Sequence, residues 1–207
     1  MPQQTPLKIA VLVSGSGTNL QALIDRIEQG DINANIACVI SNKAEALALS
    51  RARQHGIPTE VLESSAGQKR SEYDALLVKI LHRYNVRLVV LAGFMRILTD
   101  VMISAFPNAI MNIHPALLPA FPGLNAQRQA LEYGVRFTGC TVHFVDSGTD
   151  TGPIILQAVV PITAEDTVAT ISEKIQVEEH RIYPEAVRLF VQGSLKVEER
   201  RVKIQLA

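Results

Sequence analysis

The chain has 207 residues, of which 47% are hydrophobic and 19% charged, and its 20 basic side chains are balanced by 20 acidic ones. This length favours one substantial domain, and the composition excludes a disordered or membrane-embedded chain. The zero formal net charge argues against nucleic acid or an anionic membrane surface as a main partner.

The N-terminal part alternates strands with helices. An apolar run, Leu7–Val13, ends in a glycine-rich turn, and apolar residues then recur at helical spacing from Leu20 until Gly30. The alternation continues with a strand at 36–40, a helix at 45–55, a strand at 59–62, a helix over 73–81 and a strand at 88–92. This order predicts a parallel sheet covered on both faces.

The pattern changes after residue 119. A short helix is expected at 126–133, ended by Gly134, followed by strands at 139–145 and 154–160 with no helix between them, which predicts an antiparallel pair. A helical pattern runs from 166 to 192, and we expect Pro184 to kink or split it. Residues 195–204 should form a terminal hairpin or an extended tail. The predicted fold class is therefore α/β, with a Rossmann-like, open, mostly parallel twisted sheet and an antiparallel C-terminal portion.

Targeting signals and metal sites are not indicated. No signal-peptide pattern opens the chain, and the longest apolar runs, such as residues 88–94, are too short to span a bilayer, so we expect a cytoplasmic protein. Cys38 and Cys140 lie in or beside apolar runs, which favours buried reduced thiols over a disulfide. No Cys or His cluster has ligand spacing, so we expect no metal.

A glycine-rich turn at residues 14–19 (SGSGTN) joins the first strand to the first helix. Glycines let the backbone approach an anion, and the helix N-terminus favours negative charge. The turn nevertheless lacks the third glycine of a dinucleotide fingerprint and the lysine of a Walker loop. A capped glycine turn is also common for structural reasons, so phosphate binding and a structural turn both stay open.

Asn112, His114 and Asp150 offer a carboxamide, an imidazole and a carboxylate. On a strand Asn112 and His114 would point to the same face. A carboxylate beside His114 would favour the imidazolium, and the Asn112 amide would donate to an oxyanion, which suits acyl transfer. Taken singly, each residue also fits a structural role. His143, within a strand, is a rival imidazole.

The loop at residues 93–98 (GFMRIL) leaves a buried strand at its carboxyl end. Ligands of open parallel sheets bind beyond such ends, and the apolar side chains of this loop would line a pocket for a flat heterocycle. The same side chains are equally explained as core.

Five motifs together resemble the folate-dependent formyltransferases, in particular the phosphoribosylglycinamide formyltransferase family of purine biosynthesis. They are residues 14–21 (SGSGTNLQ), 40–43 (ISNK), 91–98 (LAGFMRIL), 112–119 (NIHPALLP) with 121–123 (FPG), and 150–157 (DTGPIILQ). The resemblance covers nearly the whole chain.

The resemblance implies transfer of a formyl group from 10-formyltetrahydrofolate, as co-substrate, to the amine of 5'-phosphoribosylglycinamide, with no metal. It implies one domain over 1–207, with a nucleotide-phosphate half of about 1–106 and a catalytic and folate half of about 107–207. The implied catalytic residues are Asn112, His114 and Asp150. The implied ribonucleotide-binding residues are Gly17, Thr18, Asn19, Gln176, Val177, Glu178 and Glu179. The implied folate-binding residues are Arg70, Met95, Arg96, Ile97, Leu98, Asn112, Asp146, Ser147, Gly148, Thr149 and Asp150. We expect small-molecule partners only, in a monomer or homodimer, and convergence of the trio and the turn on one cleft.

Three rivals and two departures accompany this interpretation. Methionyl-tRNA formyltransferase would need a basic C-terminal domain, and formyltetrahydrofolate hydrolase normally carries an N-terminal regulatory domain; we expect neither here. A silent nucleotide-binding module is disfavoured because all three residues of the trio are present. Asn125 stands where many relatives have histidine, and Thr18 replaces a frequent serine, but neither change removes an assigned group.

Overall fold

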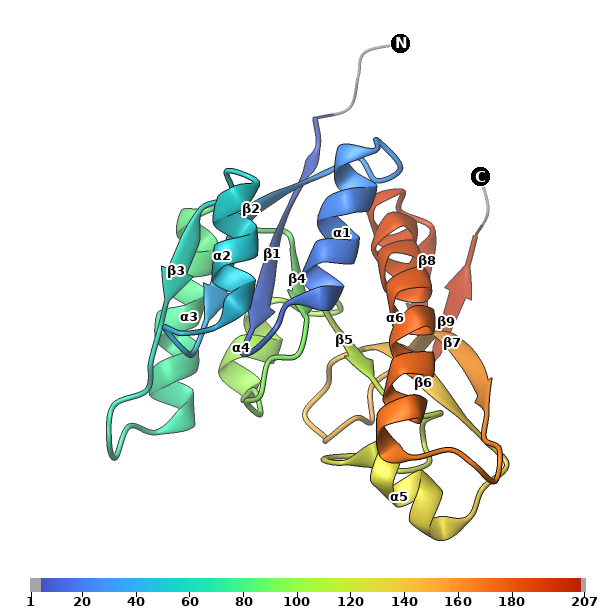
Figure 1. The fold of residues 1–207 in the computed structure, drawn as a ribbon. Helices are drawn as coiled ribbons and strands as arrows, with labels where there is room; N and C mark the ends of the chain where they lie inside the picture. The colour runs from blue at the N-terminus through green and yellow to red at the C-terminus, as the bar shows by residue number, and fades with distance from the viewer. Residues whose placement is uncertain (1–4, 206–207) are drawn as a thin grey trace. The chain divides into compact units, whose positions relative to one another are not determined.

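The computed structural model describes residues 5–205 (Figure 1). Residues 1–4, where we expect no signal peptide, and residues 206–207 lie outside the described part. The chain divides into two compact units, Met1–Met111 and Asn112–Ala207. Whether the two units act as one domain stays a prediction.

The first unit is a parallel α/β layer structure. Its strands are β1 (Leu7–Val13), β2 (Ala34–Ser41), β3 (Thr59–Val61) and β4 (Leu88–Leu91). They lie in the order β3-β2-β1-β4, and every pair is parallel. The helices are α1 (Thr18–Glu28), α2 (Leu47–Gln54), α3 (Arg70–Arg83) and α4 (Asp100–Ala105).

The direction of the crossovers assigns these helices to two faces. The chain moves outward from β1 to β3 through α1 and α2, and then returns through α3 to β4 on the other side of β1. Right-handed crossovers therefore place α1 and α2 on one face and α3 on the other. In agreement, α1 packs against α2, and α3 packs against α4 (Figure 1). All four residues of β4 are buried, as expected for a strand covered on both faces.

Helix α4 is absent from the sequence-based prediction. The side chain of Asp74, on α3, accepts hydrogen bonds from the backbone N–H of Thr99 (2.6 Å) and from its hydroxyl (2.7 Å). Asp74 thus holds the start of α4 from 25 residues away. Thr99 and Asp100 do form a local start signal, but a helix of six residues is too short to show a periodic apolar pattern.

The second unit carries the antiparallel portion. Its elements are β5 (Ile110–His114), which begins just before the boundary, α5 (Ala126–Tyr133), β6 (Phe137–Phe144), β7 (Ile154–Pro161), α6 (Val168–Val191), β8 (Leu195–Glu198) and β9 (Arg201–Ile204). The strand order is β5-β6-β7-β9-β8; β6 and β7 are antiparallel, β7 and β9 parallel, and β8 and β9 form the terminal hairpin. The predicted fold class is confirmed.

Pro184 does not split α6, so that part of the prediction is wrong. The helix runs unbroken through the proline for 24 residues. Pro184 is itself buried, as are Tyr183 and Val187 beside it. The helix packs against β6 and β7, and this burial offsets the single backbone hydrogen bond that a proline removes.

The two cysteines are buried and free, as predicted. Burial raises the pKa of both Cys38 and Cys140 to about 12. Within residues 5–205, no helix combines the length and apolar character needed to cross a membrane. The same residues include no group of three His, Cys, Asp or Glu side chains placed to hold a metal ion.

Candidate active site

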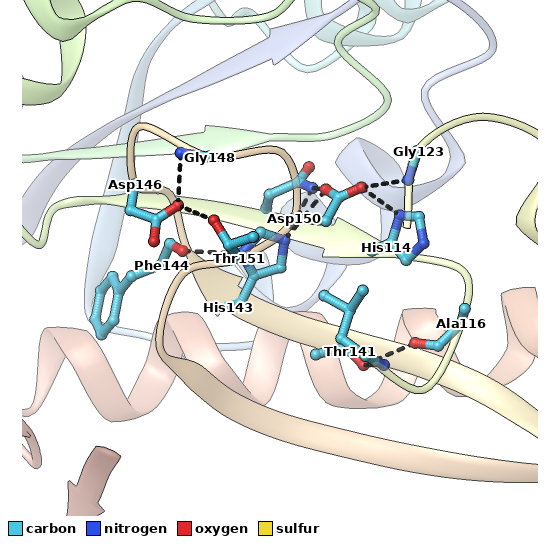
Figure 2. Close-up of polar contacts among 12 residues, drawn as sticks. His114, Ala116, Gly123, Thr141, His143, Phe144, Asp146, Gly148, Asp150 and Thr151 are labelled. Carbon is cyan, nitrogen blue, oxygen red and sulfur yellow. Dashed lines mark hydrogen bonds and ion pairs between the residues drawn. The ribbon is translucent and has the colours of Figure 1, made fainter. Parts of the chain in front are cut away.

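The carboxylate of Asp150 is the centre of a polar cluster in the second unit (Figure 2). Its Oδ2 accepts a hydrogen bond from the backbone N–H of Gly123 (2.8 Å) and lies 3.3 Å from His114 Nδ1. Its Oδ1 lies 3.5 Å from Asn112 Nδ2. The structure therefore brings together the three side chains that the sequence singles out. Asn112 and His114 reach the cluster from alternate positions of β5, which ends where Pro115 follows.

The hydrogen bonds of His114 favour its charged form. Its ring is buried, with 5% of the side chain exposed. Nε2 lies 2.8 Å from the carbonyl oxygen of Phe121, and Nδ1 faces the Asp150 carboxylate. Both partners can only accept, so both ring nitrogens must carry a proton for both contacts to be favourable. Both ring nitrogens of His114 therefore face acceptor atoms.

Asp150 is held ionised by the groups around it. Burial by itself would raise the pKa of this carboxyl group. The His143 ring, the backbone N–H of Gly123 and the charge on His114 outweigh burial, and together they hold the pKa below its ordinary value. Asp150 also has a positive φ of 55°. Such backbone is uncommon outside glycine, and an outlier of this kind is typical of functional sites.

His143 adds a second imidazole to the cluster. Its Nδ1 lies 2.8 Å from the carbonyl oxygen of Phe144, so this nitrogen is the donor. Its Nε2 lies 3.2 Å from Asn112 Nδ2 and 3.7 Å from Asp150 Oδ1. Nε2 therefore lies within reach of both the Asn112 amide and the Asp150 carboxylate. His143 thereby orients that amide, a role that the sequence left open.

The segment after β5 is tied to β6 and β7 by one buried hydroxyl. Thr141 Oγ1 donates to the carbonyl oxygen of Ala116 at 2.7 Å (Figure 2). It accepts from the backbone N–H of Leu118 (3.0 Å) and from Gln157 Nε2 (3.0 Å). Gln157 Nε2 also contacts the Leu118 carbonyl oxygen at 3.0 Å. These bonds fix the chain directly beyond His114.

The loop from Asp146 to Asp150 is compact. Asp146 Oδ1 accepts from the backbone N–H of Gly148 (3.1 Å) and from the Thr151 hydroxyl (2.6 Å). A Cβ added at Gly148 would lie 2.0 Å from Thr151 Oγ1, and one at Gly152 would lie 1.8 Å from the Phe144 carbonyl oxygen. Gly152 is needed for close approach of two backbone segments, whereas Gly148 leaves room for the Thr151 side chain, and this packing places Asp150. Ser147, Gly148 and Thr149 are exposed at the tip.

The glycine-rich turn lies in the first unit. Gly17 has φ 74° and directly precedes α1. A Cβ at Gly17 would meet Ala48 Cβ at 2.6 Å, so the turn is packed tightly on the start of α2. Arg51 Nε donates to the carbonyl oxygen of Ser16 (2.8 Å), which places a guanidinium beside the turn. Thr18 and Asn19 form the start of α1, where backbone N–H groups favour an anion.

The loop after β4 is mixed rather than plain core. Met95 and Ile97 are 68% and 59% exposed, whereas Phe94 and Leu98 are buried. The guanidinium of Arg96 lies 3.7 Å from the centre of the Tyr73 ring, a cation–π contact that fixes the middle of the loop to α3. Exposed apolar side chains on a fixed backbone suit a flat ligand.

The remaining predicted residues are spread over two helices. Arg70 is exposed at the first position of α3. On α6, Gln176 and Val177 are exposed and Glu179 is half-buried. Glu178 pairs with Arg181 at 2.6 Å, so its charge is already compensated within the helix. The predicted convergence of the turn with the trio stays a prediction.

Two contributors to the site have no side-chain signature. The N–H of Gly123 and the carbonyl of Phe121 are backbone groups, and only the fold shows that they contact the trio. His143 did carry a signal, because it is a polar residue in an apolar strand. Asn125, the departure noted above, lies directly before α5 with a φ of 57°, a conformation that asparagine tolerates better than most residues.

A family model described as formyl transferase matches residues 7–187. The chain belongs to the formyl transferase family. Phosphoribosylglycinamide formyltransferase of Escherichia coli (strain K12) is 47% identical to this formyl transferase, with 93% of this chain and 91% of that protein covered. The trifunctional purine biosynthetic protein adenosine-3 of Homo sapiens is 46% identical over 192 residues, and this chain spans 19% of its length.

Solved structures share the fold of this formyl transferase. Glycinamide ribonucleotide transformylase 1 from Symbiobacterium toebii has a TM-score of 0.96 at 54% identity, with 99% of this chain and 96% of that chain covered. A formyltetrahydrofolate deformylase from Pseudomonas syringae pv. tomato str. DC3000 has a TM-score of 0.92 at 25% identity, with 99% of this chain and 67% of that chain covered.

Proposed function

We propose that this formyl transferase moves the formyl group of 10-formyltetrahydrofolate to the amine of 5'-phosphoribosylglycinamide, giving formylglycinamide ribonucleotide. The observation that carries the proposal is the buried cluster in which Asp150 and the Phe121 carbonyl favour an imidazolium at His114, next to the Asn112 amide. The 47% identity to an E. coli protein of that name, over 91% of its length, supports the choice of substrates.

In the reaction the neutral amine attacks the formyl carbon, and the carbonyl oxygen gains negative charge. His114 Nε2–H, which lies 2.8 Å from the Phe121 carbonyl oxygen, stabilises that charge. The second donor is the Asn112 amide. One of its hydrogens is turned to His143 at 3.2 Å, and the other makes only a long contact of 3.5 Å with Asp150, so the latter is the one to donate.

Collapse of the intermediate breaks the bond between the formyl carbon and the folate nitrogen. Overall, one proton leaves the attacking amine and one proton reaches the leaving nitrogen. Asp150 is ionised, because its neighbours hold its pKa low, so it both keeps His114 charged and relays the amine proton through water. No change of charge on the protein remains at the end of the cycle.

The binding residues of this proposal are those that the family resemblance implies. Gly17, Thr18 and Asn19 hold the ribonucleotide phosphate at the start of α1, with the Arg51 guanidinium beside the turn. Residues 176–179 of α6 meet the sugar and the glycinamide, and Glu179 bonds the ribose. Arg70, residues 95–98 and residues 146–150 surround the folate. The exposed side chains of Met95 and Ile97 offer the pterin an apolar surface.

The test is a transfer assay with purified protein. It uses 10-formyltetrahydrofolate with 5'-phosphoribosylglycinamide, then without an acceptor, and then with methionyl-tRNA as the acceptor. We expect formylglycinamide ribonucleotide in the first reaction, retained after treatment with a chelator, and slow deformylation in the second. Equal folate consumption with and without the amine would instead make the protein a hydrolase. Ribonucleotide binding with no turnover of folate would make it a silent binding module.

A further inference from the structure

One chain of hydrogen bonds joins three neighbouring strand ends in the first unit. Ser14 follows β1, Asn42 follows β2, and Met95 lies in the loop after β4; these strands lie in the order β2-β1-β4. Ser14 Oγ donates to Asn42 Oδ1 at 2.5 Å and accepts from the backbone N–H of Met95 at 2.8 Å. The link from Ser14 to Met95 spans 81 residues of sequence.

The donor and the acceptor of each of these two hydrogen bonds are fixed. The Met95 N–H can only donate, so the Ser14 oxygen accepts there and its single proton is directed to Asn42. Ser14 is 6% exposed, which leaves little room for water to replace either bond. A buried hydroxyl with both functions engaged is costly to remove, because its two partners lose their bonds together.

This series of hydrogen bonds connects two segments for which ligand binding is proposed above. Ser14 opens the glycine-rich turn, and Met95 opens the exposed stretch of the loop after β4. The far end of that loop is held separately, because the Asp74 carboxylate bonds both the N–H and the hydroxyl of Thr99. Of the contacts described for the loop, the Ser14 bond is therefore the one that ties its near end to the turn.

We propose that Ser14 is a positioning residue, which braces the phosphate turn and the folate loop at one fixed spacing through Asn42 and the Met95 backbone. The identity of the two ligands rests on the proposed function. Ser14 acts through the backbone that it holds, because its hydroxyl is already engaged on both sides. Its loss should weaken ground-state binding and leave the chemistry of the trio intact.

The test compares Ser14→Ala with Asn42→Ala, their double variant and Ser50→Ala. Ser50 is a matched control, since its exposed hydroxyl bonds only within α2, to the Leu47 carbonyl. We expect Ser14→Ala to raise the KM for 10-formyltetrahydrofolate about 10-fold, with kcat within about threefold of wild type. Asn42→Ala should act in the same direction, and the double variant should be no worse than the poorer single variant, because one brace is lost in each. Ser50→Ala should match wild type.

A second measurement is independent of catalysis. Hydrogen exchange of the Met95 amide in the ligand-free protein should be about 10-fold faster in Ser14→Ala than in wild type or Ser50→Ala. If wild type fails to transfer formyl groups, the proposed function falls while this exchange still decides the brace. Unchanged exchange at Met95 would overturn the brace. If wild type is active, an unchanged KM for 10-formyltetrahydrofolate in Ser14→Ala would also overturn the brace. The same conclusion would follow if the increases in KM caused by Ser14→Ala and Asn42→Ala multiplied in the double variant.

Discussion

Asp150→Asn isolates the charge of the catalytic cluster from its shape. The amide oxygen can keep the bond from the Gly123 N–H and the contact with His114, while the amide nitrogen faces His143. The substitution keeps the shape of the side chain and removes the negative charge, and its amide nitrogen replaces the oxygen that accepts from the Asn112 amide. What is lost is the attraction that keeps His114 an imidazolium.

The size of the effect follows from the distance. Opposite charges 3.3 Å apart attract by about 5 kcal/mol at an effective dielectric constant of about 20. Part of this is lost to solvent, because 14% of the Asp150 side chain is exposed. We therefore expect kcat to fall about 10³-fold, equivalent to about 4 kcal/mol.

The assay measures kcat for formyl transfer at saturating substrates and the Kd of 5'-phosphoribosylglycinamide by calorimetry. Asp31→Asn is the control, because Asp31 forms an exposed pair with Arg26 in the first unit. We expect the Kd to stay within about threefold for both variants, because the phosphate turn does not include Asp150. A kcat for Asp150→Asn within about threefold of wild type would refute the assigned role.

Three further outcomes are expected. Gly17→Ala should lower the unfolding free energy by about 2 kcal/mol or more in urea titrations, because its Cβ meets Ala48 at a positive φ, whereas Gly15→Ala, with open space around it, should change little; equal losses would contradict this. Thr141→Val should lower the unfolding free energy by about 2–4 kcal/mol, because it leaves buried backbone groups without their partner. A loss of unfolding free energy below about 0.5 kcal/mol would contradict the role of the Thr141 hydroxyl in fixing the segment after β5. Finally, wild type should lose stability relative to Asp150→Asn as the pH falls from about 5 through the lowered pKa of Asp150. The reason is that the carboxyl group of the unfolded chain, with a pKa of about 3.9, binds its proton first. A difference in unfolding free energy between the two proteins that does not change with pH would contradict the lowered pKa.

Much of the fold was readable from periodicity. The helix predicted at 126–133 has those bounds in the structure, because Gly134 ends it with a φ of 81°. Asn112 and His114 share a strand, as their spacing predicts. The split predicted at Pro184 is wrong because the loss of one helix hydrogen bond is small beside the burial of α6 against β6 and β7.

The parts that were not readable depend on distant or backbone partners. The start of α4 is held by Asp74, far away in the sequence, and α4 itself is too short to show a periodic apolar pattern. The two groups that set the charge of His114 are the Asp150 carboxylate and the Phe121 carbonyl, and the second is a backbone group that any residue would supply. The sequence identifies His114 as a candidate, but only the folded chain shows that both of its ring nitrogens face acceptors.

The boundary between the compact units falls between Met111 and Asn112, immediately ahead of the first catalytic side chain. Every group assigned to the acid–base step, including His143 and the Gly123 amide, lies in residues 112–150. The proposed formyl chemistry thus lies in one continuous stretch, whereas the proposed phosphate turn lies upstream of it. A gene fusion at this junction would keep the proposed acid–base residues together, but it would divide the proposed ribonucleotide residues (17–19 and 176–179) and the proposed folate residues (70, 95–98 and 146–150) between two parent proteins.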